Sequence, residues 1–315
     1  MNERYKGHHG GIVVTATATA TEAHAKNFDA FIILGGSIRA NPNVTRLIQD
    51  AIALNKWIVA IGYGPQVLIE TEQLTEKRVT GFRAIRKDLE NAGATYLDAP
   101  VVADAPFITA RRPSNVPIVM TTLFRMLGLS LPEQVLPQNN AINHEWWKMA
   151  ADWGGSSRAD LVQALNMAIV SERYTLESFR QYRHRATSPR LKSILTEIIN
   201  HKQQHVEQLE KRLHQGFHEE VTWQALGSEA YADFQNWMIP SDDISITRRT
   251  LGDLQTGTVD AYRLCNQLTD PTTAEILDII ATDLSKDEQR LGKWYRQRAI
   301  NPLQPPLPTT VVAMQ

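Results

Sequence analysis

The chain has 315 residues, of which 43% are hydrophobic, and a formal net charge of -1 at pH 7. This length predicts two domains, with enough apolar residues for a core in each. The balanced charge argues against a nucleic-acid partner, and the longest apolar runs are too short to span a membrane. The N-terminus lacks the apolar region of a signal peptide, and the single cysteine, Cys265, excludes an internal disulfide. We therefore expect a soluble, cytoplasmic protein.

The first 130 residues alternate strand and helix patterns. Apolar runs predict strands, the first two of them buried, at 11–15, 28–34, 57–61, 77–81 and twice within 99–111. Helices are predicted between and after them at 44–54, from Pro65 onward, at 83–92 and at 116–127. This alternation predicts an α/β domain over residues 1–130, with a mostly parallel, flavodoxin-like sheet that carries helices on both faces.

Residues 131–156 interrupt this pattern with prolines, a Gln-Asn-Asn run and a Gly-Gly pair. We interpret them as a linker between the domains. Three tryptophans, Trp146, Trp147 and Trp153, are expected to pin the linker to a surface, and the alternative is a binding site for an outside partner.

Residues 157–300 have a helical pattern that repeats. Ser157 is a predicted N-cap, and two later turns, at Ser188-Pro189 and Asp270-Pro271, each place a cap residue before a proline at the first helical position. Two helical hairpins joined by a long crossover, with a short helical patch at 229–237, predict a ferritin-like four-helix bundle. The proline-rich tail, 301–315, is expected to be loose.

The segment 60–66 runs from a predicted strand directly into a helix. Such an elbow exposes its central side chain and points helix N–H groups at the same place, which suits a nucleophile or a bound anion. The segment Gly62-Tyr63-Gly64-Pro65-Gln66 resembles the nucleophile elbow of the ThiJ/PfpI superfamily, PfpI-like branch, which is class I glutamine amidotransferase-like. Further segments carry the resemblance over about residues 10–128, namely 28–36, 84–94, 98–102 and 109–113.

The resemblance implies a cysteine and then a histidine in this elbow, where the chain has Gly62 and Tyr63. Glycine has no side chain, so we expect a vestigial elbow (Gly62, Tyr63, Gly64) without nucleophilic catalysis at residue 62. We expect Tyr63 to fill the old pocket and bond a backbone carbonyl, because a phenol is a poor nucleophile at pH 7; the alternative is a catalytic tyrosine. Cys265 is expected to be a buried, inert thiol. The pocket above Gly62 could still hold a small anion or carbonyl compound.

The resemblance also implies a strand–helix–strand segment before residues 11–15, carrying an acidic residue that hydrogen-bonds the cysteine. About ten residues precede that strand here. Either the start lies further upstream or the sheet lacks its first strand, and the sequence leaves both open.

A di-iron ferritin-like bundle needs one Glu from each of two helices and a Glu-x-x-His pair from each of the other two. The matching positions hold Glu172, Lys202, His205, Gln255, Asp283 and Lys286. At most two of the six ligands survive, and lysine adds positive charge where metal cations would sit. We therefore expect no metal, an ion pair between Glu172 and Lys202, and a contact of Asp283 with a neighbouring lysine or with Gln255.

A second register of the last helix offers Leu284 and Asp287, which again supplies no histidine. His201 and His205 stand four residues apart, with Glu197 one turn earlier, and form a weak candidate for a mononuclear site. The preferred alternative is a solvated helix face.

Together these observations predict a two-domain protein that is not an enzyme, has no cofactor and acts as a binding or scaffold module. A stress-related setting and a homo-oligomer are implied by the resemblance alone. One alternative is a PfpI-class hydrolase or glyoxalase-like enzyme with an unrecognised nucleophile. The other is a metal-binding ferritin-like protein.

Overall fold

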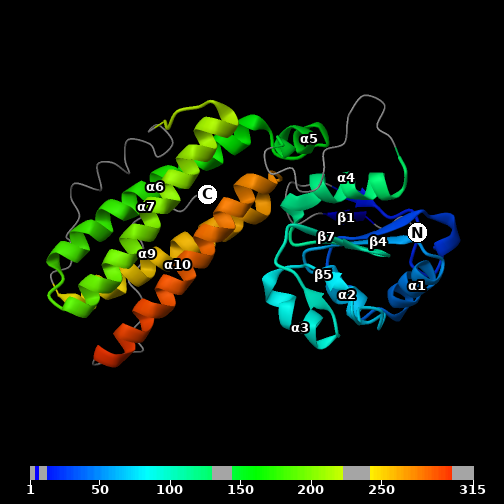
Figure 1. Cartoon of the computed structure of the whole chain (residues 1–315), viewed down its shortest axis with the longest axis horizontal. Helices are drawn as coiled ribbons and strands as arrows, with labels where there is room; N and C mark the ends of the chain where they lie inside the picture. The colour runs from blue at the N-terminus through cyan, green and yellow to red at the C-terminus, as the bar shows by residue number, and fades with distance from the viewer. Residues whose placement is uncertain (1–3, 7–12, 130–143, 223–241, 300–315) are drawn as a thin grey trace. The chain divides into compact units, whose positions relative to one another are not determined.

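The computed structural model describes residues 4–6, 13–129, 144–222 and 242–299. The chain divides into two compact units, Met1–Ala150 and Ala151–Gln315. The first unit is α/β and the second is helical (Figure 1), which confirms the predicted fold class. Among the described residues, no helix is both long enough and apolar enough to cross a membrane.

The α/β unit contains a four-stranded sheet in the order β3–β4–β8–β7. Its strands are β3 (Ala30–Ile33), β4 (Trp57–Ile61), β8 (Phe107–Ala110) and β7 (Val101–Asp104). The strands β3, β4 and β8 run parallel, while β7 is antiparallel to β8. The sheet is therefore mostly parallel, as predicted.

Side chains along a strand alternate between the two faces of the sheet. Because the side chains on both faces are apolar here, helices cover both faces. In β4, Ile58 and Ala60 belong to the core on one face, whereas Val59 and Ile61 belong to the core on the other. The first face is covered by α1 (Pro42–Ala53), α2 (Pro65–Ile69) and α3 (Arg86–Asn91), and the second by α4 (Val116–Met126) (Figure 1).

Of the first two strands, both predicted to be buried, one is exposed and the other is only partly buried. The strand β2 (Val13–Thr15) pairs with β1 (Arg4–Lys6) in a separate small sheet, and Val13 and Val14 are 54% and 60% exposed. In β3, at an edge of the main sheet, Ile33 is buried but Ile32 is 45% exposed. An apolar run predicts a strand but does not say whether both of its faces are covered.

The remaining elements of the first unit are short. They comprise the 3-10 turns η1 (Ala25–Asn27), η2 (Arg83–Ile85) and η3 (Pro113–Asn115), and a second small sheet of β5 (Arg78–Val79) and β6 (Thr95–Tyr96). The predicted helix at 83–92 is thus η2 followed by α3, and Gly93 follows it with φ +85°. The helix α5 (Trp146–Asp152) lies within the segment predicted as a linker, and Trp146 packs against Ile118.

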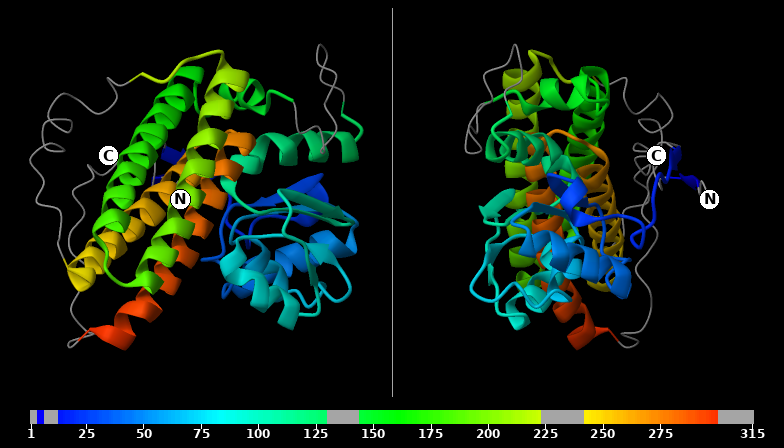
Figure 2. Two further views of the ribbon diagram at one scale, coloured as in Figure 1. Left: turned by 60° about the vertical axis from the view of Figure 1, so that its left-hand side comes forward. Right: turned by 90° about the vertical axis from the view of Figure 1, so that its right-hand side faces the viewer.

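The described part of the second unit consists mainly of four long helices, and both views of Figure 2 show them side by side. They are α6 (Arg158–Arg185), α7 (Pro189–Phe217), α9 (Asp243–Gln267) and α10 (Pro271–Arg298). Each packs on two others, in the cyclic order α6, α7, α10, α9. Ser157, Ser188 and Asp270 cap their helices as predicted. The predicted helical patch at 229–237 and the tail 301–315 lie outside the described residues.

Candidate functional site

The predicted elbow lies at the end of β4. Gly62 follows the strand with φ +64°, a left-handed conformation that glycine adopts without steric cost. Its N–H donates to the carbonyl of Ala110 at 3.0 Å, and Gly64 N–H donates back to Ile61 at 2.8 Å. The helix α2 then begins at Pro65. The elbow therefore stands at the carboxyl ends of β4 and β8, the edge where open α/β sheets bind ligands.

The space beside Gly62 is occupied by Phe82. A Cβ at residue 62 would lie 2.6 Å from Cε2 of Phe82. Phe82 N–H donates to the carbonyl of Gly62 at 3.1 Å, and its ring lies 4.8 Å from that of Tyr63 between centroids. Tyr63 is 40% exposed. The prediction that Tyr63 fills this space is therefore wrong, because the ring of Phe82 fills it.

A charged cluster follows the same edge of the sheet. Arg111, the residue after β8, is 2% exposed and donates to Asp98 at 2.6 Å, and Arg83, next to Phe82, donates to the other oxygen of Asp98 at 3.0 Å. Partial burial alone would raise the pKa of Asp98, but the hydrogen bonds from Arg111 and Arg83 outweigh it and lower the pKa. Burial, with the nearby charge of Asp98, raises the pKa of Tyr96.

The sequence analysis did not predict that these charged residues form a cluster. The segments 98–102 and 109–113 supported the family resemblance, but no function was assigned to their charged residues. A signal was present, because Arg111 directly follows a buried strand, where a charge requires a partner. The identity of that partner depended on the fold.

The bundle contains a buried ionic cluster between α6 and α7. Lys202 Nζ donates to Glu172 Oε1 at 3.0 Å, and His205 Nδ1 lies 3.1 Å from Glu172 Oε2. All three side chains are at most 8% exposed. Burial alone would raise the pKa of Glu172, but the Lys202 charge and the His205 hydrogen bond lower it to about 2. The predicted Glu172–Lys202 ion pair is present.

The helix α10 contributes carboxylates to the same region. His205 Nε2 lies 3.6 Å from Asp283 Oδ2. Asp283 also pairs with Lys286 at 3.2 Å, which confirms the predicted contact with a neighbouring lysine. The other alternative is wrong, because Gln255 donates to Glu288 at 2.7 Å.

Asp287 is a buried carboxylate, which the sequence analysis considered only in the second register of the last helix. It is fully buried, and its Oδ2 lies 2.8 Å from His201 Nδ1. Burial raises the pKa of Asp287, and the neighbouring His201 offsets this in part.

The weak mononuclear site is not assembled. His201 contacts Asp287, His205 contacts Glu172, and Glu197 pairs instead with Arg290. The alternative of a solvated helix face is also wrong for His205, which is 1% exposed. Within the described ranges, no three His, Cys, Asp or Glu side chains are grouped to hold a metal ion.

The residues at the ferritin-like ligand positions do not fit a di-metal centre. Glu172 already accepts a hydrogen bond from the ammonium group of Lys202, which would repel a metal cation placed there. Cys265, elsewhere in the bundle, is 2% exposed, as predicted, and its Sγ contacts the carbonyl of Ala274 at 3.2 Å.

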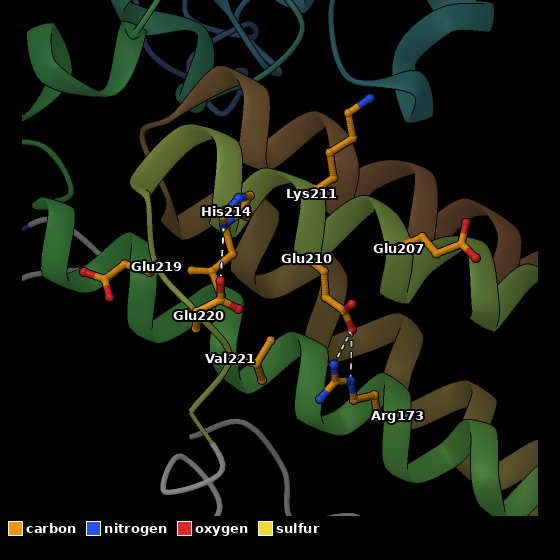
Figure 3. A pocket seen from close by; sticks show the side chains of 9 residues that line it. Arg173, Glu207, Glu210, Lys211, His214, Glu219, Glu220 and Val221 are labelled. Atoms are coloured by element: carbon orange, nitrogen blue, oxygen red, sulfur yellow. Dashed lines mark hydrogen bonds and ion pairs between the residues drawn. The ribbon is translucent and has the colours of Figure 1, made fainter.

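A polar pocket of about 600 Å³ opens beside α6 and α7 (Figure 3). Its lining residues are Arg173, Glu207, Glu210, Lys211, Leu213, His214, Glu219, Glu220 and Val221. Arg173 pairs with Glu210 at 2.8 Å across the pocket wall, and His214 lies 3.4 Å from Glu220. Within the lining, Arg173 and Glu210 thus neutralise one another.

Comparison with known proteins shows to which family the chain belongs. Residues 1–126 match the DJ-1/PfpI family. A solved structure from Anabaena variabilis, a two-domain protein containing DJ-1/ThiJ/PfpI-like and ferritin-like domains, is 42% identical with a TM-score of 0.89. The match covers 98% of this chain and 89% of that one. This chain belongs to the DJ-1/PfpI family. The predicted combination of a DJ-1/PfpI domain with a ferritin-like bundle is therefore confirmed.

Several curated relatives match a stretch of the chain about as long as the DJ-1/PfpI domain, and two of them are described here. The "Putative cysteine protease YraA" of Bacillus subtilis is 40% identical over 114 residues, which is 35% of this chain and 67% of the relative. A deglycase of Thermococcus kodakarensis is 33% identical over 124 residues, which is 37% of this chain and 73% of the relative.

These relatives correct one prediction. The absence of a thiol at residue 62 led to the expectation that the chain is not an enzyme. Several of these relatives are named as deglycases, and one is named "Putative cysteine protease YraA"; these are names of enzymes. That expectation is contradicted, since the loss of one side chain excludes one nucleophile and leaves other chemistry open.

Proposed function

We propose that this chain acts on carbonyl adducts of amines or thiols at the elbow of its DJ-1/PfpI domain. The class of substrate follows the deglycase names of its relatives. A nucleophilic thiolate at residue 62 has no part in the proposal. The acting group is instead the Tyr63 hydroxyl, because tyrosine can transfer protons as a general acid or base.

The observation that carries the proposal is the place of Tyr63. It stands at the turn between β4 and α2, at the ligand-binding edge of the sheet, and remains 40% exposed. Phe82 offers an apolar face beside it.

The proposed step is the breakdown of a hemithioacetal or hemiaminal. The Tyr63 hydroxyl donates a proton to the leaving sulfur or nitrogen while the C–S or C–N bond breaks. The adduct's own hydroxyl loses its proton to the phenolate as the carbonyl re-forms. Protons and electrons balance, and no oxidant or reductant is consumed.

The test is turnover of the methylglyoxal hemithioacetal of N-acetylcysteine, followed by ultraviolet absorbance in a buffer without primary amines. We expect Tyr63→Phe to lower kcat/KM by about 100-fold, the lower range for a lost general acid–base. The matched control is Tyr262→Phe, since Tyr262 is a 49% exposed tyrosine in the bundle. Tyr63→Phe keeps the ring contact with Phe82, so its thermal unfolding should match that of the unaltered protein.

Two results would overturn the proposal. One is a rate for the unaltered protein that does not exceed the buffer blank. The other is a rate for Tyr63→Phe equal to that of Tyr262→Phe.

A binding or scaffold role for the bundle is a second candidate, in the stress-related setting that the family resemblance implies. It is favoured by the buried Glu172–Lys202–His205 cluster, which occupies the ligand positions with ion pairs. A scaffold of this kind would self-associate as a homo-oligomer. Sedimentation equilibrium of the full chain tests it, and a monomer at all concentrations would exclude it.

A further inference from the structure

The ring of Phe82 stands where a side chain of residue 62 would have to be. A Cβ on Gly62 would lie 2.6, 3.1 and 3.5 Å from three carbon atoms of that ring. Contacts below about 3.0 Å do not occur for real Cβ atoms, so one of the two groups must move.

Moving the ring aside would change the contacts that it makes at the elbow. The backbone of Phe82 is held to the elbow by its hydrogen bond to the carbonyl of Gly62 at 3.1 Å. The ring itself packs on Tyr63 at 4.8 Å between centroids. Turning it away from residue 62 therefore disturbs its contact with the side chain to which we assign the proton transfer.

We propose that Phe82 determines what the elbow can hold. Its ring takes the place of an elbow side chain, and shortening it opens the elbow to a side chain at residue 62 or to a bulkier substrate. This inference deepens the proposed function and rests on it for the class of substrate, but the steric coupling of residues 62 and 82 is measured without turnover.

The first experiment is a double-mutant cycle of Gly62→Ala and Phe82→Ala in the full chain. Unfolding is followed by calorimetry of the transition of the α/β unit. Gly128→Ala is the matched control, because Gly128 lies in the same unit with φ +67° and a Cβ there would meet nothing within 4 Å. It therefore reports the cost of the left-handed backbone alone.

We expect Gly62→Ala to lower the unfolding midpoint by about 5 °C more than Gly128→Ala. Adding Gly62→Ala to Phe82→Ala should cost no more than Gly128→Ala does. The steric coupling is excluded if the two substitutions lower the unfolding midpoint additively, or if Gly62→Ala and Gly128→Ala lower it equally.

The second experiment uses a thiol as the probe and measures access to residue 62 in place of stability. Cys265 is the only native cysteine, so Gly62→Cys in a Cys265→Ala background carries a single thiol. We expect iodoacetamide to modify this thiol at least tenfold faster when Phe82→Ala is also present. Equal rates would show that the ring does not occupy the elbow.

The link to substrate is tested by Phe82→Leu with the hemithioacetals of methylglyoxal and phenylglyoxal. The ratio of kcat/KM for the bulkier adduct to that for the smaller should rise at least fivefold. An unchanged ratio with measurable turnover overturns the specificity role. Absence of turnover in every variant instead overturns the proposed function, while the cycle and the thiol rates still decide the coupling.

Discussion

The elbow lacks the cysteine that the family resemblance implies, and the bundle core lacks most ligands of a di-iron ferritin-like site. The two sites are filled by side chains of opposite character. At the elbow, Gly62 is accompanied by an apolar ring, that of Phe82. In the bundle, Glu172 is accompanied by Lys202 and His205, all nearly fully buried. A buried carboxylate requires a charged or hydrogen-bonding partner, whereas an empty space requires only volume. The chemistry of the residue that is present, a carboxylate in the bundle and a glycine at the elbow, therefore decides whether its neighbours are charged or apolar.

The largest effect is expected from breaking the ionic cluster of the bundle. Lys202→Met should lower the free energy of unfolding by about 3–5 kcal/mol, because Glu172 then loses its cationic partner in the core. Urea unfolding measures this. Lys286→Met is the control, since Lys286 is 66% exposed in its pair with Asp283, and it should change stability by less than about 0.5 kcal/mol.

The double variant Glu172→Gln/Lys202→Met sharpens this result. It removes the uncompensated charge and should recover most of the stability that Lys202→Met loses. If the double variant is as unstable as the single one, lost packing of the lysine stem, and not the unpaired carboxylate, accounts for the effect.

Acid pH should act on the same cluster. The pKa of Glu172 is lowered from 4.5 to about 2 in the folded protein. A lowered folded pKa contributes stability above the unfolded pKa, and this contribution is lost as pH falls from about 4.5 through about 2. The loss amounts to roughly 3 kcal/mol. Asp287 acts in the opposite direction, because its raised pKa favours the folded state at low pH.

Urea unfolding at stepped pH measures this contribution as a difference between two proteins. The unaltered chain should lose stability more steeply below pH 4.5 than Glu172→Gln/Lys202→Met, in which residue 172 does not titrate. Parallel profiles for the two proteins would contradict the assignment to Glu172.

The smallest effect is expected beside the elbow. Asp98→Asn should cost about 1–2 kcal/mol, because buried Arg111 loses a charged acceptor. The cost is lower than for Lys202→Met since Asp98 is 48% exposed and water can enter. Glu145→Gln, in an exposed pair with Lys148, is the control and should be nearly neutral. A loss for Asp98→Asn as large as that for Lys202→Met would remove the contrast between the two sites.

Local features of the fold were predictable because short-range chemistry sets them. The Ser188 and Asp270 caps and the strand–elbow–helix turn at Gly62 each depend on a few neighbouring residues. The Glu172–Lys202 pair was also predictable, although 30 residues separate its members, because helical periodicity placed both on the inward face of adjacent helices.

What the sequence by itself determined was therefore the order of elements, the two-domain architecture and the missing elbow thiol. Only the tertiary structure decided that Phe82 occupies the space beside Gly62, that Arg111 meets Asp98, and that His201 joins Asp287. It also decided that Val13 and Val14 lie exposed. Periodicity states which face a residue is on, but contacts between distant segments, and the burial they produce, depend on how the elements pack together.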